Sequence, residues 1–296
     1  MVHPPYFFKY CSAHVARLVL TNQKVRWNSP LNFNDPFDCF FSLAPKFDLS
    51  TFVQDHEADF LDLLRKKETP TLNPQNPYAE VLLSMRRRAE GVSETELKQW
   101  LRLVFGGKQQ SLEAASIALS EAWRKQMADY RVFCVCEIND NLLLWAHYTD
   151  EHKGVAFQFE CIPELDVPLL AAKPVIYSDE APGLATEEGW LQESLGLCAP
   201  NTGVDAWLRL VTTKAKAFEH EKEWRVISVR RPYESQGFED VTYYPQEISK
   251  IFLGCRISDS DKASILALVT QDFAHVHVYQ ARQHAKKYRL EFDRIK

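Results

Sequence analysis

The sequence predicts an α+β fold with a mainly antiparallel, curved sheet and a helical insertion near residues 50–130. Short apolar runs typical of strands crowd together from residue 131 onward, and helical segments are grouped between them. Residues 50–130 instead carry apolar side chains at helical spacing. Because strands resume directly after this region, we expect a single α+β domain over residues 1–296 that includes the insertion.

The segment before the insertion predicts a strand, a helix and a second strand. YFFKY, residues 6–10, predicts a short strand. The following SAHVARLVLTN has apolar residues at helical spacing, with Ser12 as the candidate N-cap. KVRWNSP predicts a second strand that Pro30 ends, and LNFNDPFD (31–38) is a cluster of turn residues.

Three segments of the insertion predict helices: STFVQDHEADFLDLLRKK, SETELKQWLRLVF and SLEAASIALSEAWRKQMADY. The second opens with a capping-box pattern, Ser93 to Glu96.

The strands predicted after the insertion are RVFCVCEI, GVAFQFE, KPVIYS, EWRVISV, VTYYP, KIFLG, HVHVYQAR and RLEFDRI. Further helices are expected near residues 184–197, at DAWLRLVTTKAKAF and at DSDKASILALVTQDF.

Composition restricts the function classes. The chain is 46% hydrophobic and 25% charged, close to the average of soluble globular proteins. Its net charge of -5 argues against a general nucleic-acid binder, although it leaves room for a local basic patch. The seven cysteines form no CxxC pair, and we find neither a secretory signal nor a membrane-spanning run. We therefore expect a cytoplasmic protein with reduced cysteines and no membrane partner.

NDPFD places Asn34, Asp35 and Asp38 in one tight loop. One interpretation is a ligand or metal contact, or a loop folded over a substrate. The other is an Asx-turn, in which Asp and Asn side chains bond nearby backbone N–H groups.

LWAHYTDEHKG places Trp145, His147, Tyr148 and His152 between a turn and a strand. The apolar residues of this stretch fit a short helix, and His147 on its own could be a core histidine with satisfied hydrogen bonds. A loop rich in His, Tyr and Lys just before GVAFQF is also a good place for the rim of a pocket. Gly154 would let the chain turn sharply into the strand.

FEHEKEWRVISV carries the strongest single signal. Side chains alternate faces along a strand, so Glu221, Glu223 and Arg225 are expected on one face. Buried carboxylates are costly unless they are paired. A salt-bridged sheet edge, in which Arg225 neutralises Glu223, would satisfy them. Alternatively, one glutamate orients a ribose hydroxyl or stabilises a developing cation while the other guides a nucleophile.

Metal and nucleotide motifs of the common kinds do not occur in the sequence. Cys134 and Cys136 alternate with apolar residues in a predicted strand, so we expect them to face a core rather than a metal. There is no spaced His/Cys set typical of zinc, no P-loop, no GxGxxG and no GxSxG. We therefore predict no metal cofactor.

The motifs together, in this order, resemble a bacterial family catalogued only as a domain of unknown function. The matching stretches are FNDPFDCF, CVCEINDNLLLWAHYTDEHKGVAFQF, FEHEKEWRVI and KIFLGCRIS, and they span nearly the whole chain outside the helical insertion. The chain departs from the pattern by CVC where CFS is usual, and by Phe218 where a tryptophan often precedes the acidic pair. The resemblance gives a family without an established activity.

A second resemblance is to ADP-ribosyltransferases, which use NAD. It rests on an early strand with a polar and aromatic face around Tyr6, on Tyr148, and on the late E-x-E. The resemblance implies that Glu223 is the catalytic carboxylate as nicotinamide leaves and that Glu221 handles the acceptor. It also implies that Tyr148 or Trp145 stacks on the nicotinamide, and that Lys9, His147 or Arg17 holds the phosphates. The residues expected to contact the cofactor are Lys9, Tyr10, Arg17, Asn34, Asp35, Asp38, Trp145, His147 and Arg225.

Two alternatives stay open at this point. A metal-dependent nuclease or phosphoesterase would bring NDPFD and EKE together within a few Å around Mg²⁺, with Lys153 or His147 assisting. A non-catalytic sensor or partner protein, for example in a toxin or phage-defence system, would use the paired charges only as a scaffold. The sequence leaves open the acceptor (protein, nucleic acid or small molecule), any antitoxin or defence partner, and the oligomeric state.

Overall fold

The chain forms two compact units, which we call the sheet unit and the helical unit. The computed structural model describes the chain except residues 1, 41–42, 44–46, 49–50, 69, 77, 106–108, 183–185 and 198–203 and the side chains of 109–115 and 204–206. The sheet unit comprises Met1–Asp38, Gln126–Asp179 and Lys214–Lys296. The helical unit comprises Cys39–Lys125 and Glu180–Thr213. Among the described helices, none combines the length and the apolar character needed to cross a membrane.

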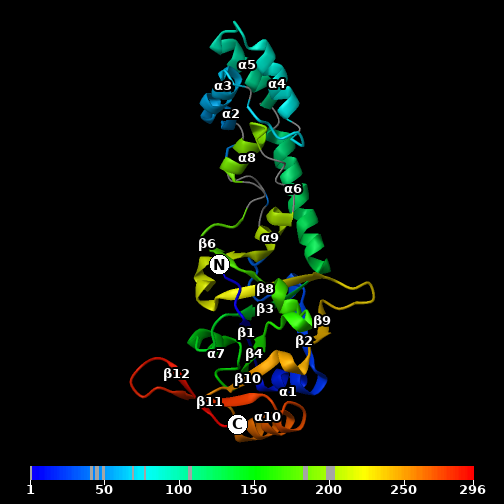
Figure 1. Ribbon diagram of the computed structural model, residues 1–296, viewed down its shortest axis with the longest axis vertical. Helices are drawn as coiled ribbons and strands as arrows, with labels where there is room; N and C mark the ends of the chain where they lie inside the picture. Colours follow the sequence, from blue (N-terminus) through cyan, green and yellow to red (C-terminus); the bar gives the residue numbers. More distant parts are fainter. Residues whose placement is uncertain are drawn as a thin grey trace. The chain divides into compact units, whose positions relative to one another are not determined.

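The sheet unit is built on an open, mostly antiparallel sheet, so the predicted α+β class is confirmed (Figure 1). Its strands lie in the order β12 (Leu290–Arg294), β11 (His277–Gln283), β10 (Ile248–Leu253), β4 (Val155–Glu160), β1 (Tyr6–Cys11), β3 (Tyr130–Cys136), β2 (Lys24–Asn28) and β9 (Phe238–Thr242). The pair β10–β11 is parallel. Off this path, β8 pairs antiparallel with β3 and with β5, and their bounds are Glu223–Val229 and Lys173–Pro174.

Apolar side chains alternate between the two faces of the sheet. Phe7, Phe157 and Ile251 belong to a core that includes residues of α1 (Ala13–Asn22) and α10 (Asp259–Asp272). Their neighbours Phe8 and Phe252 face the opposite side, where they pack with residues of α7 (Leu142–His147). Successive side chains of a strand point to opposite faces, and here both faces receive apolar side chains, so the sheet is buried on both sides. In Figure 1, α1 and α10 lie close together on the sheet unit.

The helical unit holds the predicted insertion and one later segment. Its helices are α2 (Phe52–Asp55), α3 (Glu57–Arg65), α4 (Ala79–Arg88), α5 (Glu94–Phe105), α6 (Gln109–Gln126), α8 (Glu187–Ser194) and α9 (Val204–Thr212). The predicted capping box forms, because Ser93 N–H donates to Glu96 Oε2 at 3.1 Å and Glu96 N–H to Ser93 Oγ at 3.3 Å. The helix predicted for DAWLRLVTTKAKAF ends early, at Thr212, and the short strand β7 (Thr213–Ala215) follows it.

A left-handed turn joins α7 to β4. Asp150, Glu151 and His152 have backbone φ angles of 51°, 58° and 67°, a conformation that residues other than glycine rarely adopt. Two glycines allow the close contacts that fix this turn. A Cβ on Gly154 would lie 2.1 Å from Cys11 O, and a Cβ on Gly254 would lie 2.1 Å from His152 O. The predicted need for glycine at position 154 is therefore explained by backbone approach.

Gly154→Ala tests this account of the turn. We expect a loss of about 3 kcal/mol in the free energy of unfolding, because β1 and β4 must separate to admit the methyl group. Gly91→Ala serves as the comparison: at φ 73° the alanine carries a backbone cost of about 1 kcal/mol, but nothing lies within 4 Å of the added Cβ. Urea unfolding of both variants measures the difference. A Gly154→Ala protein no less stable than the Gly91→Ala protein would contradict the close approach.

Candidate functional site

A pocket of about 430 Å³ opens on the sheet unit between β1, β3 and α7. β1 pairs with β4 along its length but meets β3 at Phe8↔Cys136, so the two strands diverge beyond that point. Lys9 Nζ donates to Cys134 O at 2.8 Å across the divergence. The pocket is lined by Phe8, Lys9, Tyr10, Asn28, Asn32, Phe33, Asn34, Asp38, Cys134, Val135, Cys136, Leu144, His147, Tyr148, Lys214, Glu221 and Glu223.

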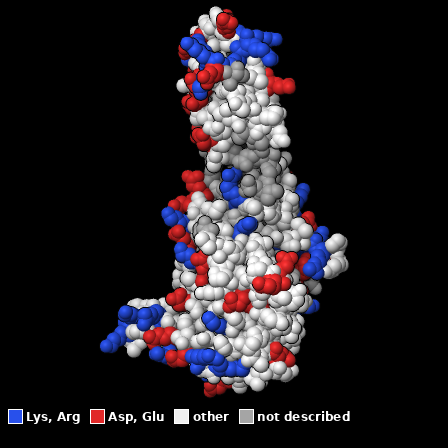
Figure 2. Space-filling view, viewed as in Figure 1, with Lys and Arg blue, Asp and Glu red and all other residues white. Residues whose placement is uncertain are grey.

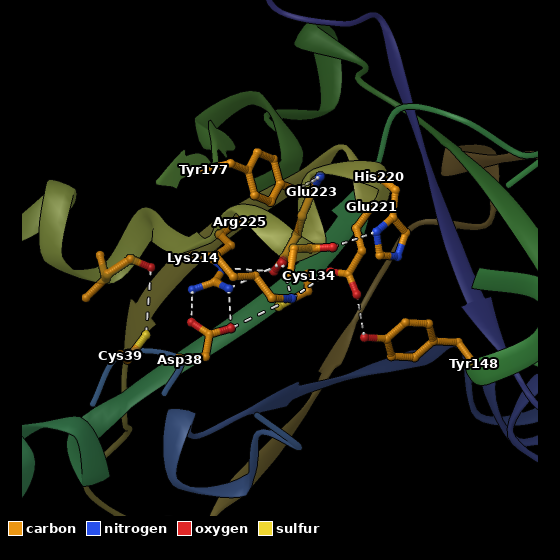
Figure 3. A network of polar contacts seen from close by, with 12 residues as sticks. Asp38, Cys39, Cys134, Tyr148, Tyr177, Lys214, His220, Glu221, Glu223 and Arg225 are labelled. Carbon is orange, nitrogen blue, oxygen red and sulfur yellow. Dashed lines mark hydrogen bonds and ion pairs between the residues drawn. The ribbon is translucent and has the colours of Figure 1, made fainter. Parts of the chain in front are cut away.

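Five charged side chains form a buried network at this pocket, and none of the five residues is more than 7% exposed. We call them the charged network: Asp38, Lys214, Glu221, Glu223 and Arg225. Figure 3 shows the two cations lying among the three carboxylates. The network holds one more carboxylate than cation. Because burying unpaired charge is costly, each member depends on the others for its place.

Arg225, in β8, joins the loop before the insertion to the E-x-E segment. Its guanidinium donates to both oxygens of Asp38, at 2.8 and 2.6 Å, and its Nε donates to Glu223 Oε1 at 2.8 Å. The Asp38 contact is the bidentate form, in which two parallel hydrogen bonds fix the geometry of a carboxylate. Arg225 is 0% exposed and does not line the pocket, so it positions the carboxylates from behind.

Lys214, in β7, is a member that sequence reasoning missed. Its Nζ lies 2.6 Å from Glu221 Oε2, 3.0 Å from Glu223 Oε2 and 3.9 Å from Asp38 Oδ2. The sequence predicts a helix for the segment that contains this lysine, and a lysine on a helix surface is ordinarily solvated. The available signal was the shortage of cations: one arginine does not neutralise two glutamates and an aspartate that are all buried.

Glu221 does not lie on the strand with Glu223, so the predicted three-residue strand face is wrong for this residue. Glu221 ends the 3₁₀ helix η5 (Lys216–Glu221), and Lys222 has a left-handed φ of 49° before β8 begins. This turn still leaves both glutamates at the pocket. Glu221 Oε1 accepts a hydrogen bond of 3.0 Å from the Tyr148 hydroxyl, so its two oxygens have different partners.

Protonation states follow from these contacts. Burial would raise the pKa of Glu223, but Arg225 and Lys214 outweigh it and lower this pKa to about 2. Burial opposes the charge on Lys214, yet Glu223 and Glu221 raise its pKa. Burial, and then Glu221, raise the pKa of Tyr148, so its hydroxyl keeps the proton that it donates. Glu223 is therefore ionised at every physiological pH.

The NDPFD loop contributes in two different ways. Asp35 Oδ1 accepts a hydrogen bond of 3.0 Å from Phe37 N–H, which is the Asx-turn interpretation, and Asp35 does not line the pocket. Asp38 and Asn34 do line it. The loop thus uses its first aspartate for the turn and its last for the charged network.

Of the other predicted site residues, three line the pocket and two do not. Lys9, Tyr10 and His147 line the pocket. Trp145 is fully buried and does not line the pocket, and its Nε1 donates to Asn139 O at 2.7 Å. Arg17 forms an ion pair with Asp261 between α1 and α10 and is not a pocket residue.

Glu223 makes stability depend on pH in a direction that can be measured. Its pKa is about 2 in the folded protein against an ordinary value of 4.5, so its ionised form contributes stability above pH 4.5 that is lost as the pH falls toward 2. We expect the destabilisation caused by Glu223→Gln to shrink by about 2 kcal/mol between about pH 6 and about pH 3 in urea unfolding. The exposed Glu219→Gln is the control. An equal cost of Glu223→Gln at both pH values would refute the low pKa.

Comparison with known families identifies the central part of the chain. A family described as "Protein of unknown function (DUF2971)" matches residues 144–226. Neither the curated proteins nor the solved structures give a match. The matched stretch contains Tyr148, Lys214, Glu221, Glu223 and Arg225. A DUF2971 domain is therefore found in the part of the chain that supplies every member of the charged network except the loop aspartate.

Proposed function

We propose that the protein is an ADP-ribosyltransferase-like enzyme that uses NAD. One observation supports this most strongly: two carboxylates with different partners reach the same pocket. Glu223 is held by Arg225 and Lys214, whereas one oxygen of Glu221 contacts only the neutral Tyr148 hydroxyl among the contacts described. The sequence predicts Glu223 as the catalytic carboxylate, whereas these contacts favour Glu221 for that role. Glu221 contacts the ribose, and Glu223 supplies fixed negative charge behind it.

The pocket suits the nicotinamide nucleoside part of NAD. Its volume of about 430 Å³ lies within the range of small-molecule sites. Tyr10, Phe33 and Tyr148 offer aromatic surface, and Asn28 and Asn34 offer amide groups for a carboxamide. Lys9 and His147, also in the lining, are basic side chains that can contact the phosphates.

The charge of the site favours the proposed chemistry. Cleavage of the bond between nicotinamide and ribose leaves positive charge on the sugar. The charged network carries one net negative charge, buried where electrostatic interactions are stronger than in water. A ribose hydroxyl can take the place of the Tyr148 hydroxyl on Glu221 without breaking an ion pair, because tyrosine and ribose are both neutral donors.

A metal-dependent nuclease or phosphoesterase is the second candidate, because Asp38 does converge with Glu221 and Glu223 as that hypothesis requires. The ammonium of Lys214 occupies the space between these carboxylates, where a divalent ion would have to bind. Among the described residues, no group of His, Cys, Asp or Glu has the arrangement of a metal site. The geometry therefore favours NAD over a divalent ion, and the two are distinguished by titration.

Calorimetric titration with NAD⁺, and separately with Mg²⁺ or Mn²⁺, tests the proposal. We expect NAD⁺ alone to bind and to raise the melting temperature, and Glu221→Gln to weaken binding about tenfold through the lost charge-assisted hydrogen bond. Glu219→Gln, an exposed change of the same kind two residues earlier, is the control. Nicotinamide release is then assayed with candidate protein, nucleic-acid and small-molecule acceptors.

Three results would contradict the proposal in different ways. A response to divalent metal alone would move the assignment to phosphodiester chemistry. Equal NAD⁺ binding by Glu221→Gln and Glu219→Gln would remove Glu221 from the ribose site. Silence toward both ligands would favour a non-catalytic sensor or partner, including one in a toxin or defence system.

A further inference from the structure

The hairpin between β11 and β12 carries positive charge that the rest of the chain lacks. Residues 282–296 hold six Lys and Arg side chains and two acidic ones, in a chain whose net charge is -5. Figure 2 shows a projecting group of Lys and Arg at the lower left, where Figure 1 places this hairpin. β12 lies at one edge of the sheet, and charges on an edge strand often serve only to prevent pairing with other chains.

The charges at the tip exceed what an edge strand needs. Glu291 and Asp293 are both within ion-pair distance of Arg282, at 2.5 and 2.7 Å, and Glu291 also lies 3.4 Å from Arg289. The two acidic side chains of the hairpin are thus paired with Arg282 on β11 and with Arg289, the residue before β12. The exposed Lys286 and Lys287 have no acidic partner among the described residues.

An aromatic side chain stands among these cations. Tyr288 is 100% exposed, although it lies in a connection that is held by defined hydrogen bonds. His284 N–H donates to Arg289 O at 3.1 Å, and Lys286 N–H to His284 Nδ1 at 2.9 Å. An ordered tip that exposes a whole aromatic ring between cations gains nothing for folding. Such a ring is what unpaired bases stack on.

A second pocket, of about 500 Å³, adjoins the hairpin. It is lined by Leu142, His152, Cys255 and residues 283–290, which include the cations of the tip. His152 Nδ1 is buried there without a hydrogen-bond partner in the part of the chain that the structure describes. The hydrogen-bonding capacity of this nitrogen is therefore unused in the described part of the chain, in a residue that lines the pocket.

We propose that the β11–β12 hairpin and the adjoining pocket bind single-stranded nucleic acid. Lys286 and Lys287 contact phosphates, Tyr288 stacks on a base, and the pocket accepts a neighbouring unstacked base beside His152. The lysines would also suit an acidic protein surface, but the exposed ring and the adjoining pocket together suit unstacked bases, which is why the observations favour nucleic acid. The proposal goes beyond the transfer reaction and does not rest on it.

Fluorescence anisotropy with short labelled single-stranded DNA and RNA, over a range of salt concentrations, tests the proposal. The slope of log Kobs against log salt should fall by about 1.4 in the Lys286→Ala/Lys287→Ala variant, because each phosphate contact contributes about 0.7 for single strands. Tyr288→Ala should weaken binding about fivefold or more with little change in the salt slope. Arg87→Ala/Arg88→Ala, two adjacent exposed cations of α4, is the matched control for net charge.

Several outcomes would overturn the proposal. One is the absence of saturable binding to any oligonucleotide. Another is a loss in the lysine variant no larger than in the α4 control. Tighter binding to duplex than to single strands would remove the stacking role of Tyr288. Equal binding to a polyglutamate peptide, unaffected by Tyr288→Ala, would assign the hairpin to an acidic protein instead.

Discussion

The pocket of the sheet unit depends on the ion pairs of the charged network. In this network the ammonium of Lys214 and the guanidinium of Arg225 are buried among three carboxylates. Each carboxylate would be expelled from the interior without a cation beside it. Arg225 binds Asp38, which is 187 residues away in the chain, and so ties the NDPFD loop to β8. Lys214 joins the segment before η5 to the same point. Three separate parts of the sequence are thereby fixed around one cavity.

The two glutamates of the charged network have different partners. Glu223 is ionised and immobilised, because both of its oxygens contact cations. Glu221 shares Lys214 but turns its other oxygen toward a half-exposed tyrosine hydroxyl. Fixed charge and an exchangeable hydrogen bond thus lie side by side, which is the arrangement that a site needs when positive charge develops on a bound sugar.

Local patterns predicted most of the fold and only part of the site. Alternation at Phe7 and Phe8 and the helical spacing in the insertion are local properties, so strands and helices could be predicted from them. Glu221 and Glu223 were found because two acids before an apolar run are conspicuous. Lys214 was missed because nothing local distinguishes a buried lysine from a solvated one. Glu221 is separated from β8 by the left-handed backbone conformation of Lys222, and no pattern in the sequence predicts that conformation.

We propose that the charged network presents Glu221, rather than Glu223, to a ribose hydroxyl in the pocket. The most direct measurement is a crystal structure of the protein with NAD⁺ or nicotinamide riboside bound. We expect density for the nicotinamide nucleoside between β1, β3 and α7. A ribose hydroxyl should lie within hydrogen-bond distance of Glu221, with the Tyr148 hydroxyl displaced and both ion pairs of Glu223 intact. Density outside this pocket, or an unbroken Tyr148–Glu221 hydrogen bond with ligand present, would contradict the account.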